Sequence, residues 1–214
     1  MFMKSYGQLC SAARALDIVG DRWNLLIVRE LLIRRQIRFT DLQAGLPGIA
    51  PNLLVSRLRE LEENGVVRRD TAVAPATGLL YALTERGREL DGVVRELVKW
   101  GAPTIVDAPP DATFQMHWLS LPARFLLKDS RPDDAPITIR FGDPRDGFDL
   151  VVANGTTAVE PCRLDATPGA TVTGPGLSLV GLLQGAIPLA GAAAYGITVD
   201  GAPDALPRVL PSSR

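Results

Sequence analysis

The sequence predicts an α+β fold divided between two domains, residues 1–108 and 109–214, and three observations carry that prediction. The first half has apolar residues at helical spacing and contains one hairpin-like pair of strands before its last helix. The second half is a series of short strand-like runs separated by turn residues. Only three of the 17 prolines, Pro47, Pro51 and Pro75, precede residue 103. This change in composition indicates two differently built domains that meet near residue 108.

Composition and charge indicate which kinds of molecule the chain could bind. The 214 residues are 46% hydrophobic and 22% charged, which is typical of a globular chain. The formal net charge is −1, so bulk charge favours neither nucleic acid nor a membrane surface. Residues 1–108 hold 15 basic and 13 acidic side chains, and residues 109–214 hold 8 and 11. The net charges of +2 and −3 make the first half the better candidate for a polyanionic partner.

Cysteine and histidine usage gives no sign of a metal, a cofactor or a catalytic site. Cys10 and Cys162 lie 152 residues apart, a spacing that supports no disulfide framework, zinc site or CxxC motif. His117 is the one histidine, and it lacks a nucleophile-base constellation around it. The start of the chain does not resemble a signal peptide, and glycine and proline interrupt the apolar stretch 177–199. We therefore expect a cytoplasmic protein that is not an enzyme and does not enter a membrane.

The first elements of the chain are helices. Residues 9–19 and 23–33 carry apolar side chains at helical spacing, and Asp21 between them is placed to cap the second helix. Thr40 and Gln43 fit the capping-box pattern, which predicts a short helix from about residue 40. Leu46-Pro47-Gly48-Ile49 then ends that helix.

A helix is predicted from Pro51, a favourable first helical residue, to about Asn64. Leu54, Leu58 and Leu61 form one apolar stripe on it, which must face a core. The opposite face carries three polar side chains, those of Asn52, Ser56 and Arg59. Such a face can read base edges in a major groove, and it can equally be a solvated helix surface.

The residues that follow favour the nucleic-acid interpretation. Runs 66–69 and 79–83 are strand-like and are joined through residues 74–78. Thr84 then precedes a last helix that reaches about Trp100 and has one face to bury, for which a second subunit is a candidate. A helix-turn-helix followed by a hairpin is a winged helix.

A run of motifs extends over nearly all of residues 8–101. It comprises Cys10, GDRWNLLI at 20–27, RFTDL at 38–42, LPGI at 46–49, RLREL at 57–61, GVVR at 65–68 and YALT at 81–84, with Gly87 and Trp100. This run resembles the HxlR-type winged-helix regulators, relatives of the MarR proteins. The resemblance implies a dimeric bacterial transcription factor that binds double-stranded operator DNA, with helix 51–64 in the major groove and hairpin 66–83 along the backbone or minor groove.

Three positions depart from the family pattern. Ser11 stands where a proline is common, Val55 where a serine is frequent, and Gly78-Leu79-Leu80 replaces a basic wing strand. The last departure leaves Arg68 and Arg69 as the expected phosphate partners of the wing. The complete set expected to contact DNA is Arg38, Thr40, Pro51, Asn52, Ser56, Arg57, Arg59, Arg68 and Arg69.

Cys10 has two possible roles. Some regulators of this type sense oxidants or electrophiles through a cysteine at this position, which makes Cys10 a candidate redox sensor. Buried in a helix, the same cysteine would be an inert small hydrophobe.

Beyond the linker we expect a mainly antiparallel sheet. Residues 113–118 alternate, which predicts a strand with Phe114, Met116 and Trp118 on one face and a solvated His117 on the other. Strands are also predicted over 137–141, 148–152, 157–160 and 170–173, followed by a helix over 177–187 that is apolar almost all round.

This half resembles the sterol-carrier-protein type of domain through its sequence at 168–174, 179–185 and 195–201. The resemblance implies a tunnel between the sheet and the helices that accepts a small apolar ligand. The alternative is that the same apolar side chains form a closed core. The residues expected to line the tunnel are Phe114, Met116, Trp118, Phe141, Leu179, Leu182, Leu183, Ile187 and Tyr195.

Two functions follow from these observations. The first is a homodimeric DNA-binding regulator whose second domain senses an apolar molecule or helps to fix the dimer. The second is a lipid carrier or substrate-holding protein in which the winged helix serves as an interaction module. An enzyme has only the expected apolar pocket in its favour.

Overall fold

The computed structural model describes residues 5–71, 79–109 and 111–210. It divides into two compact units, Met1–Lys99 and Trp100–Arg214, which we call unit 1 and unit 2. The linker 74–78 of the predicted hairpin lies outside the described residues. The domain boundary expected at residue 108 stays a prediction.

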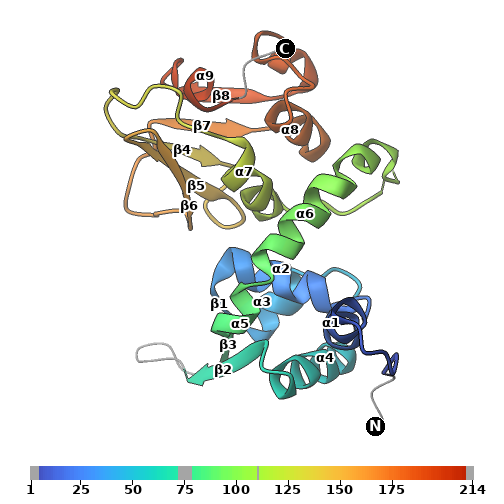
Figure 1. Ribbon diagram of the computed structural model, residues 1–214. Coiled ribbons are helices and arrows are strands. Elements are labelled where there is room, and N and C mark those ends of the chain that lie inside the picture. Colours follow the sequence, from blue (N-terminus) through green and yellow to red (C-terminus); the bar gives the residue numbers. More distant parts are fainter. Residues whose placement is uncertain (1–4, 72–78, 110, 211–214) are drawn as a thin grey trace. The chain divides into compact units, whose positions relative to one another are not determined.

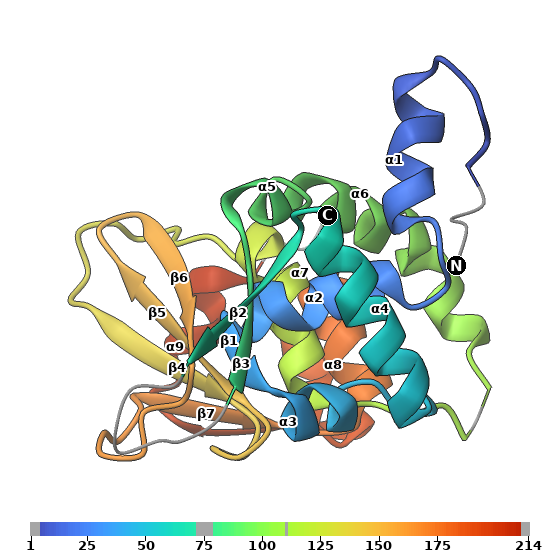
Figure 2. The ribbon, with the colours of Figure 1, turned by 90° about the horizontal axis from the view of Figure 1, so that it is seen from below.

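Unit 1 is mainly helical with a small sheet (Figures 1 and 2). Strand β3 lies in the middle of the sheet and pairs antiparallel with both β1 and β2. The elements in chain order are α1 (Ser11–Val19), α2 (Asn24–Arg34), β1 (Gln36–Arg38), α3 (Phe39–Ala44), α4 (Pro51–Glu63), β2 (Val67–Thr71), β3 (Leu79–Leu83), α5 (Glu85–Arg88) and α6 (Asp91–Gly101).

The core of unit 1 confirms the predicted apolar stripe of α4. Leu54, Leu58 and Leu61 are 0%, 2% and 0% exposed, and Ile27 of α2 and Leu42 of α3 are also fully buried. Pro51 occupies the start of α4, where the amide that proline lacks would have no helical partner. The predicted order of helices and hairpin is therefore present, with the short strand β1 in addition.

Both capping predictions for the first three helices are wrong. Trp23, not Asp21, precedes α2, and it makes no side-chain cap; the Asp21 carboxylate pairs instead with Arg57. Helix α3 starts at Phe39, one residue earlier than predicted, because the extended backbone of Arg38 at the end of β1 leads directly into it. Thr40 therefore lies inside the helix and is exposed.

The last predicted helix of unit 1 is two helices. Thr84 caps α5 as predicted, because its Oγ1 accepts a hydrogen bond from the Gly87 amide at 3.0 Å. Gly87 lies so close to the residue before β2 that a Cβ there would be 2.1 Å from the Val66 carbonyl oxygen. A turn at residues 89–90 then separates α5 from α6.

Unit 2 is a five-stranded sheet with helices packed on its apolar face (Figure 1). The strand order is β6-β5-β4-β7-β8, and all neighbours are antiparallel except β4 and β7. This confirms the α+β class and a mainly antiparallel sheet. Its elements are α7 (Ser120–Leu126), β4 (Ile137–Phe141), β5 (Phe148–Ala153), β6 (Thr156–Glu160), β7 (Ala170–Thr173), α8 (Gly176–Leu183), β8 (Thr198–Gly201) and α9 (Ala205–Val209), with 3-10 helices over Ala102–Asp107, Met116–Leu119 and Leu189–Tyr195.

The strand predicted over 113–118 is wrong. Residues Met116–Leu119 form a 3-10 helix that continues into α7. Asp146 fixes this start, because one carboxylate oxygen accepts the Met116 amide at 2.9 Å and the other lies 2.9 Å from Nδ1 of His117. His117 is accordingly 3% exposed and paired, not solvated.

Helix α8 is shorter than the 177–187 predicted for it. It ends at Leu183, and Gly185 follows with a φ of +76°, a left-handed conformation that suits glycine. The chain then turns back, so that Ile187 covers Gly181; a Cβ on Gly181 would lie 3.0 Å from Cδ1 of Ile187. The space left by this glycine is therefore filled.

Candidate nucleic-acid interface

Helix α4 buries the leucines of one face in the core, and its opposite face is polar. Asn52, Val55 and Arg59 are exposed, and Ser56 is half-buried. The structure thus brings together on one side of α4 the three polar side chains expected to contact DNA. A helix with this division of faces can enter a major groove about 12 Å wide.

A buried charged cluster holds the turn between α3 and α4. Glu30 of α2 is fully buried, and its carboxylate accepts hydrogen bonds from Nε and Nη2 of Arg29 at 3.1 and 2.8 Å. Nη2 of Arg29 also lies 3.3 Å from the Gly45 carbonyl oxygen, to which it donates. A Cβ on Gly45 would be 2.3 Å from the Glu30 carboxylate. This cluster ties the end of α3, where the turn toward α4 begins, to α2, and sequence periodicity gave no sign of it.

Several arginines of the expected interface pair with carboxylates of the same unit. Arg57 pairs with Asp21 and Glu60, and its side chain is 21% exposed. Ser56 donates to Glu60 at 3.2 Å. Arg57 therefore links α4 to the α1–α2 turn, and its expected DNA contact would require it to leave these partners.

The wing arginines pair at the surface. Arg68 lies 3.0 Å from Asp70, and Arg69 pairs with Glu62 of α4. Both arginine side chains remain about half exposed, at 51% and 42%. Exposed pairs of this kind contribute about 0–1 kcal/mol, so phosphate groups can replace the carboxylates at little cost.

Two arginines of the expected interface are unpaired. Arg38, at the end of β1, and Arg59, on α4, are both exposed. Neither has an ion-pair partner among the residues that the structure describes. Both are therefore available to an anion without any exchange of partners.

Cys10 is exposed, whereas the inert alternative requires a buried cysteine. It lies directly before α1, and the backbone amides of Ala13 and Ala12 lower the pKa of its thiol. Amides at a helix start favour the thiolate, which is the nucleophilic form.

The residues expected to line an apolar tunnel in unit 2 are only partly brought together. Leu179, Leu182 and Leu183 are at most 1% exposed and belong to the core between the helices and the sheet. Phe141 is fully buried and stacks on Phe148, with 5.0 Å between ring centroids. The others are half-buried (Met116, Trp118 and Ile187) or exposed (Phe114, 39%, and Tyr195, 53%).

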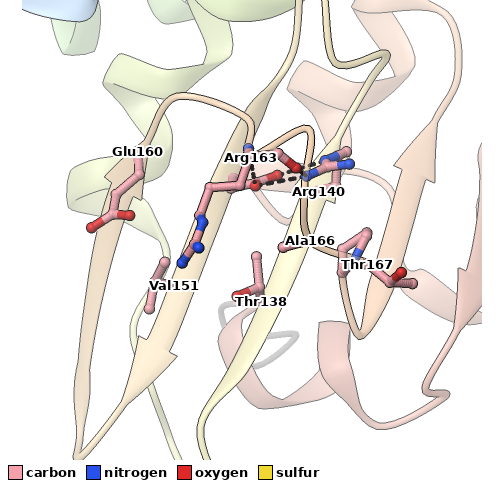
Figure 3. A pocket seen from close by; sticks show the side chains of 9 residues that line it. Thr138, Arg140, Val151, Glu160, Arg163, Ala166 and Thr167 are labelled. Carbon is pink, nitrogen blue, oxygen red and sulfur yellow. Dashed lines mark hydrogen bonds and ion pairs between the residues drawn. The ribbon is translucent and has the colours of Figure 1, made fainter.

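The opposite face of the unit 2 sheet holds a polar cavity that sequence analysis missed (Figure 3). Its floor is the pair formed by Arg140 of β4 and Asp149 of β5, joined by two hydrogen bonds of 2.7 and 2.9 Å. The volume is about 200 Å³. The lining residues are Thr138, Arg140, Asp149, Val151, Glu160, Arg163, Ala166, Thr167 and Pro168.

The loop 161–169 is tied to this floor through its backbone. The Arg163 carbonyl oxygen accepts from Arg140 at 2.7 Å, and the Arg163 amide donates to Asp149 at 3.0 Å (Figure 3). Burial raises the pKa of the Asp149 carboxyl, but these hydrogen bonds from Arg140 and Arg163 outweigh burial and lower it. One charged residue in each apolar strand-like run, Arg140 in 137–141 and Asp149 in 148–152, was a signal for this charged floor.

Within ranges 5–71, 79–109 and 111–210, no helix has both the length and the apolar character that crossing a membrane requires. In the same ranges, no three His, Cys, Asp or Glu side chains are grouped closely enough to hold a metal ion.

Comparison with known proteins places unit 1 in a family. Residues 18–108 match the HxlR-like helix-turn-helix family. The uncharacterized HTH-type transcriptional regulator YvaP of Bacillus subtilis (strain 168) is 39% identical over 92 residues, which are 43% of this chain and 84% of YvaP. The HTH-type transcriptional regulator YodB of the same organism is 35% identical over 86 residues, 40% of this chain and 76% of YodB. The structure of YodB in its reduced form matches 48% of this chain and 100% of that chain with 30% identity and a TM-score of 0.40.

Proposed function

The chain belongs to the HxlR-like helix-turn-helix family, and we propose that it is a cytoplasmic, homodimeric transcriptional regulator that binds operator DNA through α4. One observation carries the proposal: α4 buries its leucine stripe and leaves Asn52 and Arg59 exposed on the other side. Asn and Arg are side chains that form bidentate contacts with adenine and guanine.

The dimer is supported by an apolar stripe on α6. Val93, Leu97 and Trp100 recur at i, i+4 and i+7 and are 46%, 45% and 81% exposed. Val94 faces the core instead, at 4%. An exposed stripe of large apolar side chains is typical of a surface that meets another protein. A second copy of the chain would cover it symmetrically.

The test is binding to DNA fragments selected from a random duplex library. We expect enrichment of a palindrome whose half-sites are centred about 34 Å apart, or a multiple of that distance, because one helix reads only a few base pairs. Leu97→Asp should halve the mass in solution and abolish tight operator binding, while the circular dichroism spectrum persists. Glu96→Gln, on the adjacent position, is the matched control. Sequence-independent binding by the intact dimer would contradict the proposal.

The role of unit 2 rests on the sequence resemblance to sterol-carrier domains, which implies an apolar effector between α8 and the sheet. The buried leucines of α8 favour the closed-core alternative instead. Thermal melts with fatty acids, isoprenoids and sterols decide between them, since a ligand at one hundred times its Kd stabilises by about 2.7 kcal/mol. A lipid-dependent shift without any retention on DNA would favour the lipid-carrier alternative.

A further inference from the structure

Val55 is the one large apolar side chain that α4 exposes. It is 46% exposed, whereas Leu54, Leu58 and Leu61 are buried and Leu53 is half-buried. Asn52 precedes it by three residues and Arg59 follows it by four, so all three belong to neighbouring turns of the same helix. Because nearly half of this side chain is exposed, its isopropyl group contributes little to the core of unit 1.

The chemistry of the major groove indicates which group of a base Val55 can contact. Each base edge there carries hydrogen-bond donors or acceptors, and the one apolar group is the C5 methyl of thymine. An isopropyl group placed over a cytosine or a guanine edge would remove water from polar atoms without replacing their hydrogen bonds. Against a thymine it buries a methyl group instead.

We propose that Val55 is a specificity-determining residue that recognises the methyl group of one thymine in each operator half-site. The proposal rests on the proposed function, because it requires α4 to lie in the major groove. Under this proposal, a thymine at one fixed position of each operator half-site is selected through an apolar contact.

The position of Asn52 restricts the half-site further. Side chains three residues apart on a helix have Cβ atoms about 5–6 Å apart. Successive bases on one strand are about 3.4 Å apart. An adenine bound by the Asn52 amide should therefore lie one or two base pairs from the thymine bound by Val55.

The experiment uses the full chain and the palindrome obtained from the random library. Each thymine of one half-site is replaced in turn by uracil, which differs only in lacking the methyl group. One replacement should weaken binding about fourfold, the equivalent of one buried CH₂ at about 0.8 kcal/mol. Replacing the symmetry-related thymine as well should weaken it about fifteenfold. In Val55→Ser the affinities for thymine and uracil at that position should be equal.

Arg59→Ala is the matched control on the same face of α4. It should weaken binding to the thymine and the uracil duplex by the same factor and leave their fourfold ratio unchanged. If uracil is neutral at every position in the wild-type protein, or if Val55→Ser keeps the fourfold ratio, the methyl contact is overturned while operator binding stands. If the library yields no preferred sequence, the proposed function fails together with it.

Discussion

The wing of unit 1 and the sheet of unit 2 hold ion pairs of arginine that differ in exposure. In unit 1, Arg69 pairs with Glu62 at the surface, and its side chain stays 42% exposed. In unit 2, Arg140 donates two hydrogen bonds to Asp149, and its side chain is 9% exposed. Arg208 pairs with Asp129, and its side chain is 4% exposed. Exposed pairs exchange partners at little cost, whereas removing one member of a buried pair leaves an uncompensated charge. Arg69 of unit 1 is therefore available to phosphate groups, whereas Arg140 and Arg208 of unit 2 maintain the fold of that unit.

The largest expected effect is on the stability of unit 2. Asp149→Ala leaves the Arg140 guanidinium buried beside a backbone carbonyl and without its carboxylate, which should cost about 3–5 kcal/mol. Glu62→Ala, the matched change in unit 1, removes an exposed partner and should alter stability by no more than about 0.5 kcal/mol. Urea unfolding of the full chain, followed by circular dichroism, measures both. Equal losses in the two variants would contradict the comparison.

The cysteines of the two units are also expected to differ in reactivity. Burial, followed by the nearby Asp149 carboxylate, raises the pKa of the Cys162 thiol to about 11, while helix amides lower the pKa of the exposed Cys10 thiol. Because only the thiolate reacts, iodoacetamide at pH 7 should label Cys10 at least about a hundredfold faster than Cys162. Mass spectrometry of tryptic peptides gives the two rates.

Cys10→Ser should remove the fast phase of labelling, and Cys162→Ser should leave it. In urea the two cysteines should react at similar rates, since the difference comes from the fold. A Cys10 that reacts no faster than a free thiol would contradict the candidate redox-sensor role, as would a Cys10→Ser protein that still responds to its oxidant on DNA.

Patterns within a single element were predictable from the sequence. The leucine stripe of α4 and the strands β4, β5, β6 and β7 follow from side-chain period alone. Thr84 could be identified as a cap because its partner, Gly87, is three residues away. Each of these features depends on residues close together in the chain.

Features fixed by distant residues were not predictable. Strands β1 and β8 exist through pairing with β3 and β7, which are distant from them in the sequence. Asp21 was assigned to a cap, but its partner Arg57 lies 36 residues away. Asp146 similarly decides the conformation of residues 116–119 from 29 and 30 residues away. In the candidate site the exposed arginines were predictable, and their carboxylate partners were not.

Acid should destabilise unit 2 through Asp129. Hydrogen bonds from Arg208, opposed by burial and assisted by the amides of Arg131 and Gly155, hold the pKa of the Asp129 carboxyl well below its usual range. A carboxyl whose folded pKa is lowered stabilises the fold fully above its unfolded pKa of about 3.9 and loses that contribution as the pH falls toward the folded value. The urea midpoint of unit 2 should therefore decrease from about pH 4.5 downward.

The control for this pH dependence is Asp129→Asn, which cannot ionise. It should be less stable than the wild type at pH 6 and show a shallower decrease below about pH 4. Identical pH profiles for the two proteins would show that the Asp129–Arg208 pair does not carry the acid sensitivity.

The smallest expected effects concern the wing arginines of unit 1. Arg68→Ala and Arg69→Ala should each weaken operator binding by a similar factor for all sequences, because phosphate contacts carry no base information. Each should also reduce the slope of log K against log salt by about one unit. Arg145→Ala, an exposed arginine of unit 2, should leave the slope unchanged. Fluorescence anisotropy at a series of salt concentrations provides the slopes.

Glu62→Gln separates pairing from phosphate contact at Arg69. In the free protein Glu62 competes with phosphate for this guanidinium, and on DNA its negative charge remains near the backbone. Removing that charge should strengthen operator binding severalfold at low salt, and the gain should shrink as screening increases. If Glu62→Gln changes nothing while Arg69→Ala reduces the slope, Arg69 reaches phosphate without releasing Glu62. If neither variant has an effect, the wing strand β2 lies outside the DNA interface, and the contacts come from α4 and Arg38.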